Sequence, residues 1–259
     1  MAVEKGRIVL VGRTGAGKST LVNMLVNGNL NPPHLAEMGN GLHGTTKICE
    51  TFVGGRGWTV IDTMGFGEPD TGSVSNTNAQ KLVIDFLKKV KGRYSHIIFV
   101  IEKGRFDLVT EIIWKTFLQI FKGGERNFVV LFTKTDDEWL QENLEQIKTE
   151  FPECKQFQYV DFPEIDDDPE FEKENSEIRM SERDRLESEL TRMFAGSWVE
   201  PDIFRMGDAE IEKKAENILV YIAKLIKSML QKYGAKALQN SVTIFVAVVE
   251  LVTVFAGGF

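Results

Sequence analysis

The amino-acid sequence predicts a three-layer α/β fold with a mostly parallel sheet, followed by a C-terminal helical extension. From about residue 7 to residue 160, short β-branched runs alternate with amphipathic stretches, a pattern typical of βαβ units. After residue 160 only helical spacing recurs. The 259 residues, 42% of them hydrophobic, are enough to bury a sizeable core.

Six apolar runs are the candidate strands: Ile8–Val11, Lys47–Val53, Trp58–Asp62, His96–Ile101, Phe128–Phe132 and Gln156–Val160. Between them, apolar residues at helical spacing predict crossover helices of about three turns each. These are Lys18–Val26, Asn78–Val90, Val109–Phe121 and Glu138–Phe151.

The chain beyond the last strand has a different composition. Residues 161–177 include nine acidic side chains, and their mutual repulsion predicts a solvated, mobile loop. Two helices are expected next, the heavily charged Asn175–Phe194 and then Asp208–Tyr233. The second has one apolar stripe, which predicts that it docks on the domain: Ile211, Ala215, Ile218, Leu219, Ile222, Leu225, Ile226, Met229 and Leu230.

Net charge and cysteine content argue against several classes of function. A net charge of −7 is the wrong sign for a nucleic-acid-binding protein. Cys49 and Cys154 lack CxxC spacing, so neither a disulfide framework nor a zinc site is expected. The N-terminus does not resemble a secretory signal, and we expect a cytoplasmic protein that could be attached to the cytosolic face of a membrane.

A glycine-rich loop follows the first strand and opens a helix. It has the GxxxxGKS form, with a further threonine, Thr20, behind it: Gly12, Arg13, Thr14, Gly15, Ala16, Gly17, Lys18 and Ser19. Glycines let backbone N–H groups turn toward phosphates, and the helix adds its positive N-terminus. We expect Lys18 to neutralise the β- and γ-phosphates and Ser19 to bind Mg²⁺.

Two further elements are expected at the phosphates. Asp62 and Gly65 form a DxxG motif at the end of the third strand; Asp62 would reach Mg²⁺ through water, and the Gly65 N–H would sense the γ-phosphate. Thr45 and Thr46 lie between the two motifs, and Thr46 is the favoured hydroxyl ligand of Mg²⁺ in the triphosphate state. The nucleotide would thereby control the neighbouring loops.

The base is read by a third element, Thr133-Lys134-Thr135-Asp136, of the TKxD form. The Asp136 carboxylate can accept two hydrogen bonds from guanine that adenine does not offer, and the Lys134 stem can cover the base. The expected ligands are therefore GTP and GDP. The alternative is an ATPase or a nucleotide kinase that uses the same glycine-rich loop. In that case Asp136 would have no role in recognising the base.

Together these motifs resemble the GTPases of immunity-associated proteins, the GIMAP or IAN family with an AIG-type G domain, relatives of septins and chloroplast import-receptor GTPases. The resemblance covers about Arg7 to Leu230 and is strongest in Phe99–Phe106, which is similar to the family's conserved box, and in Thr46–Cys49. It implies an AIG-type G domain over 1–200, an amphipathic helix over 201–239 and a hydrophobic tail over 240–259. The last guanine-contacting loop departs from the family pattern, because Tyr159–Pro163 lacks the usual Asn.

Hydrolysis is expected to be slow. Phe66 stands where Ras-like proteins carry a water-positioning glutamine, and an apolar side chain cannot orient water. The resemblance implies G domains that meet across their nucleotides, with Arg105 acting in trans. Two alternatives stay open: Arg105 is structural and pairs with Asp107 or Glu111, or the chain is a non-hydrolysing, GTP-dependent scaffold that oligomerises on membranes.

The last 18 residues, Val242–Phe259, include 13 apolar ones. A span needs about 20 mostly apolar residues, and Glu250 in the middle of the segment is costly to insert. Membrane contact, docking on the G domain, self-association and truncation of a longer segment all remain open.

Overall fold

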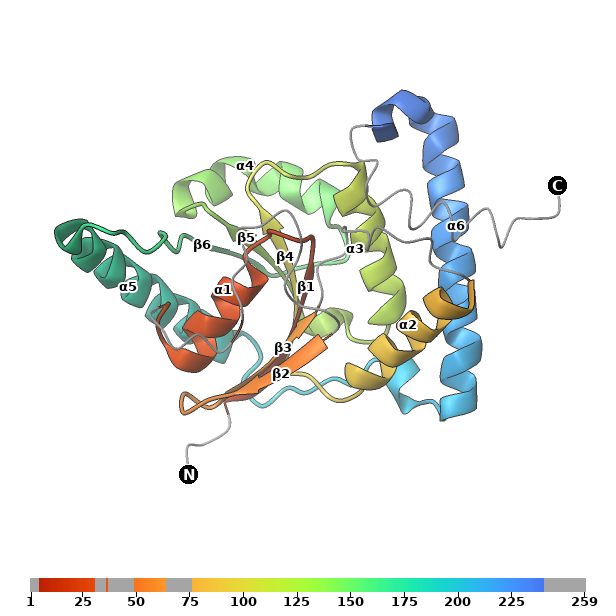
Figure 1. Cartoon of the computed structure of the whole chain (residues 1–259), viewed down its shortest axis with the longest axis horizontal. Helices are drawn as coiled ribbons and strands as arrows, with labels where there is room; N and C mark the ends of the chain where they lie inside the picture. The colour runs from red at the N-terminus through yellow and green to blue at the C-terminus, as the bar shows by residue number, and fades with distance from the viewer. Residues whose placement is uncertain (1–4, 31–35, 37–48, 64–75, 240–259) are drawn as a thin grey trace.

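The computed structural model describes residues 5–30, 36, 49–63 and 76–239 (Figure 1). A six-stranded sheet has the order β2-β3-β1-β4-β5-β6, in which only β2 runs antiparallel to its neighbour. The mostly parallel sheet is confirmed, and no strand end differs from the predicted one by more than two residues. The strands are β1 (Gly6–Gly12), β2 (Cys49–Val53), β3 (Trp58–Thr63), β4 (His96–Glu102), β5 (Phe128–Thr133) and β6 (Phe157–Val160).

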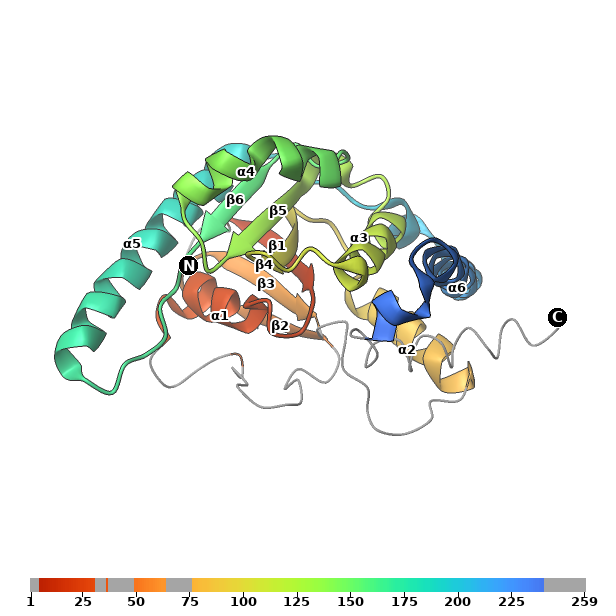
Figure 2. The same ribbon diagram turned by 90° about the horizontal axis from the view of Figure 1, so that it is seen from above.

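Six α-helices accompany the sheet in the part of the chain described: α1 (Lys18–Val22), α2 (Asn76–Lys89), α3 (Leu108–Ile120), α4 (Asp137–Glu150), α5 (Pro169–Met193) and α6 (Asp208–Gln239). Short 3₁₀ turns lie at η2 (Glu125–Asn127) and η3 (Asp202–Arg205). Alternate residues of each strand contact opposite helical layers. α1 and α5 cover one face, while α2, α3 and α4 cover the other and α6 packs outside α2 and α3 (Figure 2).

The predicted helix Lys18–Val26 is only partly α-helical. After Val22 the chain continues as a π-helical turn, η1 (Asn23–Asn27), which ends where Gly28 takes a φ of 90°. The apolar spacing could not reveal this change, because it depends on a contact distant in sequence. The buried Asn23 amide donates to the Ala36 carbonyl and accepts from the Ala36 N–H, both at 2.9 Å.

Helix α6 confirms the predicted apolar stripe. Its side chains Ile211, Ala215, Ile218, Leu219, Ile226 and Met229 are buried, and the helix packs against both α2 and α3. It extends to Gln239, six residues beyond the predicted end. No helix in the described ranges is long and apolar enough to cross a membrane; the tail Val242–Phe259 lies outside them.

The prediction of a mobile acidic loop is wrong from Pro169 onward, where α5 begins. Asp168 caps this helix by accepting from the Glu170 N–H at 2.9 Å, and acidic side chains in a first turn are stabilised by the helix dipole. The buried Arg179 donates to the carbonyls of Pro163 and Glu164. Capping and this tertiary anchor offset the charge repulsion on which the prediction rested.

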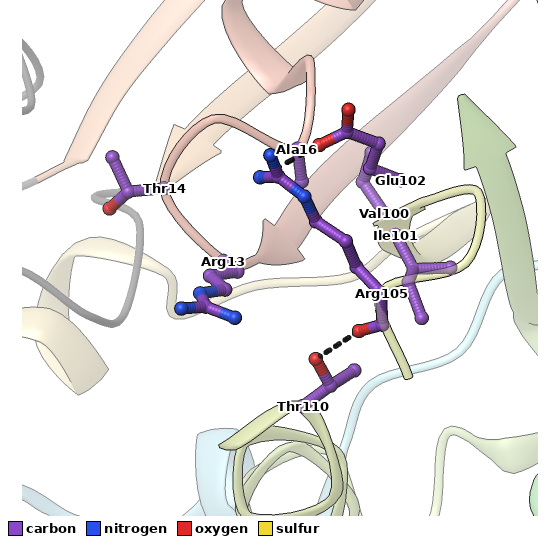
Figure 3. A pocket seen from close by; sticks show the side chains of 8 residues that line it. All are labelled: Arg13, Thr14, Ala16, Val100, Ile101, Glu102, Arg105 and Thr110. Atoms are coloured by element: carbon purple, nitrogen blue, oxygen red, sulfur yellow. Dashed lines mark hydrogen bonds and ion pairs between the residues drawn. The ribbon is translucent and has the colours of Figure 1, made fainter. Parts of the chain in front are cut away.

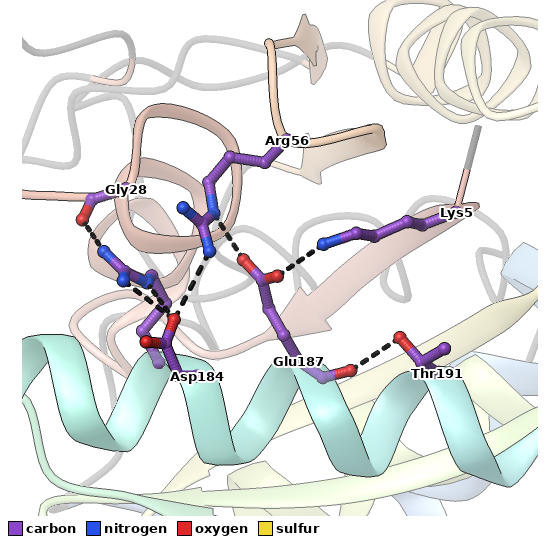
Figure 4. A network of polar contacts seen from close by, with 7 residues as sticks. Lys5, Gly28, Arg56, Asp184, Glu187 and Thr191 are labelled. Atoms are coloured by element: carbon purple, nitrogen blue, oxygen red, sulfur yellow. Dashed lines mark hydrogen bonds and ion pairs between the residues drawn. The ribbon is translucent and has the colours of Figure 1, made fainter. Parts of the chain in front are cut away.

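A polar network fastens α5 to the rest of the domain (Figure 4). Glu187 accepts from Lys5 at 2.7 Å and from Arg56 at 2.6 Å, and Arg183 donates to the Gly28 carbonyl. Burial raises the pKa of Glu187, but the hydrogen bonds from Arg56 and Lys5 outweigh it and leave the pKa below its usual value. One helix thereby holds the N-terminal segment, the β2–β3 turn and the end of η1.

His96 makes the free energy of unfolding depend on pH. Burial lowers its pKa from 6.5 to about 4, although the Leu190 carbonyl, 2.7 Å from Nε2, opposes the shift. Between these two pKa values the unfolded chain binds a proton that the folded chain refuses, so stability falls on acidification. We expect this histidine to account for a loss of about 2 kcal/mol between pH 7 and pH 5.

Urea unfolding at both pH values checks this, with His96→Gln as the comparison because glutamine does not titrate. The carboxylates contribute to both proteins, so the difference between their pH dependences isolates His96. Equal losses in the two proteins would contradict the expectation.

Candidate functional site

The glycine-rich loop lies at the carboxyl end of β1, between β3 and β4 in the sheet. Gly12 must remain glycine, because a Cβ there would lie 2.2 Å from the Val100 carbonyl oxygen. Gly15 and Gly17 have φ values of 77° and 88°, which side chains other than glycine rarely adopt. The loop therefore turns tightly into α1, whose N-terminus is suited to phosphate.

Lys18 is buried at the base of this loop. Its ammonium donates to the carbonyls of Gly12 at 3.2 Å and Arg13 at 3.0 Å. Burial lowers its pKa to about 8, and the nearby Asp62 carboxylate opposes the shift. A phosphate would add negative charge and hold the proton more firmly, so the site is well suited to an anionic ligand.

Ser19 and Asp62, two residues expected at Mg²⁺ from separate motifs, lie in contact at the sheet edge. The Ser19 hydroxyl donates to Asp62 Oδ2 at 2.8 Å, and Asp62 is buried. Hard oxygen donors in this position fit Mg²⁺. No group of three or more His, Cys, Asp or Glu side chains suited to a metal occurs in the described segments, so a metal here would need phosphate and water oxygens as well.

Three of the predicted positions, Thr46, Gly65 and Phe66, lie outside the described residues. The remaining loop residues are placed: Arg13 pairs with Asp107 at 2.9 Å, and Thr14 lines the outer edge of the loop beside it. Thr20 belongs to the first turn of α1.

The TKxD turn is joined directly to the glycine-rich loop. Thr133 ends β5, and its hydroxyl donates to the Ala16 carbonyl at 3.0 Å. Lys134 has a φ of 58°, the one positive value at a non-glycine residue within the described ranges. The Thr135 N–H donates to the Val160 carbonyl at 3.4 Å. The turn is therefore held between the phosphate loop and β6.

Asp136 caps the next helix. Its Oδ1 accepts from the Trp139 N–H at 2.9 Å, which fixes the carboxylate at the start of α4. Asp161 follows β6, in the segment whose guanine contact the sequence could not place. Burial, together with the negative charges of Glu182 and Asp136, raises the pKa of Asp161. The charges of Asp161 and Asp136 therefore interact, so the segment after β6 lies near the TKxD turn.

Arg105 lies against the glycine-rich loop. The structural alternative paired it with Asp107 or Glu111, but its ion-pair partner is neither of these residues. Its Nη1 is 2.7 Å from Glu102 Oε2 (Figure 3). Asp107 instead caps α3 and pairs with Arg13, and Glu111 pairs with Lys115. The reason is the chain reversal at Gly104, whose φ of 75° folds Arg105 back so that its N–H donates to the Glu102 carbonyl.

Glu102 is the residue that reasoning from the sequence missed. Its other oxygen, Oε1, is 3.0 Å from Lys134 Nζ. The signal was available, since an acidic residue ends an otherwise apolar strand. Its partners were not, because the turn at Gly104 brings Arg105 to Glu102, and the β4–β5 register that pairs Glu102 with Thr133 brings Lys134 to it.

One protein-family model matches part of the chain. Residues 7–134 match the family model described as 50S ribosome-binding GTPase. The matched range contains the glycine-rich loop, Asp62 and Lys134, and it ends two residues before Asp136. No curated protein sequence matches the chain.

Solved structures of S. thermophilus NFeoB are similar in arrangement. One mutant bound to GMPPNP has 11% identity and a TM-score of 0.47, covering 98% of this chain and 95% of that one. A second mutant, bound to GDP.AlF4-, has 12% identity and a TM-score of 0.46, covering 98% and 96%. NFeoB bound to GDP.AlF4- and K+ has 11% identity and a TM-score of 0.46, covering 98% and 90%.

Proposed function

We propose that this chain, a P-loop protein with a guanine-nucleotide-binding G domain, is a GTP- and Mg²⁺-dependent switch of the AIG type that hydrolyses GTP slowly. The observation that carries the proposal is the assembly of three sequence motifs at one sheet edge. Ser19 contacts Asp62, and Thr133 contacts the Ala16 carbonyl. Phosphate, metal and base could therefore be bound together.

The residues have separate roles in this proposal. Lys18 and the loop N–H groups bind the phosphates, Ser19 and Asp62 hold Mg²⁺, and Asp136 reads the base. When bound, Mg²⁺ would neutralise charge on the β- and γ-oxygens. In the triphosphate state Thr46 is proposed to give its hydroxyl to Mg²⁺ and the Gly65 N–H to sense the γ-phosphate. Phe66 would make turnover slow, because it offers no group to orient water.

A second copy could complete the site. An arginine supplied to the transferring phosphoryl group is worth about 10³–10⁵ in rate. The Arg105 side chain is 52% exposed and lies beside the glycine-rich loop, where another G domain facing the nucleotide could receive it. We therefore propose that turnover rises with dimerisation.

Turnover per molecule, measured over a range of protein concentrations, tests this. We expect it to rise at least tenfold in the wild type and to stay at its low-concentration value in Arg105→Ala. The affinity of Arg105→Ala for GTP should stay within about twofold, because the proposed contact is made to the other copy. Arg192→Ala is a matched control, since Arg192 is an exposed arginine paired with Glu189 on α5.

Two other results would change the proposal. Zero turnover at every concentration would favour the non-hydrolysing, GTP-dependent scaffold. Equal concentration dependence in Arg105→Ala would make this arginine structural. Light scattering with GDP and with a non-hydrolysable GTP analogue, with and without residues 240–259, would separate nucleotide-driven association from association through the tail.

A further inference from the structure

We propose that Glu102 holds Arg105 against its own P-loop and so sets the protein concentration at which a second copy can receive that arginine. The inference rests on the role proposed above for Arg105 in trans. It adds Glu102 as a positioning residue. It also predicts the protein concentration at which dimerisation raises turnover, which the three sequence motifs do not address.

The carboxylate of Glu102 lies between two cations. Oε2 is 2.7 Å from Arg105 Nη1, and Oε1 is 3.0 Å from Lys134 Nζ. The Glu102 side chain is only 12% exposed, whereas those of Arg105 and Lys134 are 52% and 63% exposed. A largely buried carboxylate needs its counter-ions, because burying an unpaired charge is costly. It therefore restrains both cations more than a surface glutamate would.

The backbone directs Arg105 back toward its own chain. A tight turn forms in which the Arg105 N–H donates to the Glu102 carbonyl at 3.0 Å, and the Thr110 hydroxyl donates to the Arg105 carbonyl at 2.7 Å. The guanidinium reaches the phosphate loop, where Nη1 would lie 3.8 Å from a Cβ added to Gly15. Arg105, Glu102, Arg13 and Thr14 line one hollow (Figure 3). Its volume is about 10 Å³, which is barely enough for one water.

This arrangement opposes contact in trans. Before Arg105 can bind a phosphoryl group of another copy, its guanidinium must leave Glu102, and the lost ion pair offsets part of the new interaction. Lys134 stays paired with the Glu102 carboxylate when Arg105 leaves, so the buried charge keeps one counter-ion. Glu102 therefore connects the turn that carries the base reader to the arginine that would act on the phosphate.

Glu102→Gln tests the proposal in the full chain. Glutamine keeps the size of the side chain and an oxygen for Lys134, but it removes the charge that holds Arg105. We expect the protein concentration for half-maximal turnover to fall about fivefold. Sedimentation with GDP and aluminium fluoride should show a dimer dissociation constant lowered by the same factor. Affinity for GDP is measured first, as a check that the variant is folded.

Matched variants assign the effect to Arg105. Glu111→Gln removes a carboxylate that pairs with Lys115 at 2.6 Å on α3, and it should shift neither quantity. The double variant Glu102→Gln/Arg105→Ala should lose the fivefold shift. An unshifted threshold in Glu102→Gln, or a shift that persists in the double variant, would overturn the inference. The proposed role of Arg105 in trans fails by a different result, which is the same concentration dependence of turnover in the wild type and in Arg105→Ala.

Discussion

Replacing Lys18 by alanine is expected to lower the affinity for GTP and GDP by at least about a hundredfold. The Lys18 ammonium is the buried cation of the glycine-rich loop, held by two loop carbonyls and close to Asp62. Hydrogen bonds between charged groups contribute about 1.5–3 kcal/mol each, and each 1.4 kcal/mol is a tenfold change in affinity. Loss of two such bonds to phosphate accounts for the expected decrease.

Displacement of a fluorescent GDP analogue measures this affinity, with Lys115→Ala as the control. Lys115 lies on α3 and pairs with Glu111 outside the site, so its removal should change affinity by less than about twofold. Thermal unfolding of both variants without nucleotide separates lost binding from lost folding. Retention of affinity within fivefold in Lys18→Ala would show that the phosphates bind elsewhere.

Asp136→Asn is expected to lower the affinity for GTP by about 10²–10⁴-fold and to favour xanthosine triphosphate. The carboxylate can accept from the ring N–H and the amine of guanine, and two such bonds contribute about 3–6 kcal/mol. An asparagine amide can donate to the carbonyl that xanthine has in place of the amine. Its oxygen can still accept from the Trp139 N–H, as Oδ1 does now, so α4 should keep its cap.

Competition among GTP, ATP and xanthosine triphosphate against a labelled guanine nucleotide measures this specificity. Asp137→Asn is the neighbouring control, because Asp137 accepts from Gln141 on the exposed side of α4. Comparable displacement by ATP and GTP in the wild type would refute the guanine assignment and revive the ATPase or kinase alternative.

The sheet and the phosphate loop could be predicted because their signals are local. A short apolar run defines a strand within four to seven positions, and the GKS of the glycine-rich loop lies within seven residues of the end of β1. The meeting of Ser19 with Asp62 was also predictable, since β1 and β3 are parallel neighbours whose carboxyl ends share an edge. The TKxD turn lies at the same edge, because β5 is also parallel to its neighbours and the turn follows its carboxyl end.

Other features depended on residues far apart in the chain. Charge content alone predicted a loop where α5 begins, because repulsion is visible in the sequence, whereas the anchor of Arg179 on the carbonyls before the helix is not. The π-turn after α1 likewise depends on the hydrogen bonds between Asn23 and Ala36.

The motif residues and the positions of the strands along the chain are thus properties of the sequence alone, since each rests on neighbours within a few positions, whereas the order of the strands in the sheet depends on pairings between distant segments. The partner of Arg105 was decided only by the tertiary structure. The sequence offered Asp107 and Glu111 as nearby carboxylates, but the turn at Gly104 brings Glu102 to Arg105, and the β4–β5 register brings it to Lys134. Ion pairs form between side-chain ends, and the positions of those ends depend on backbone geometry that residue spacing does not specify.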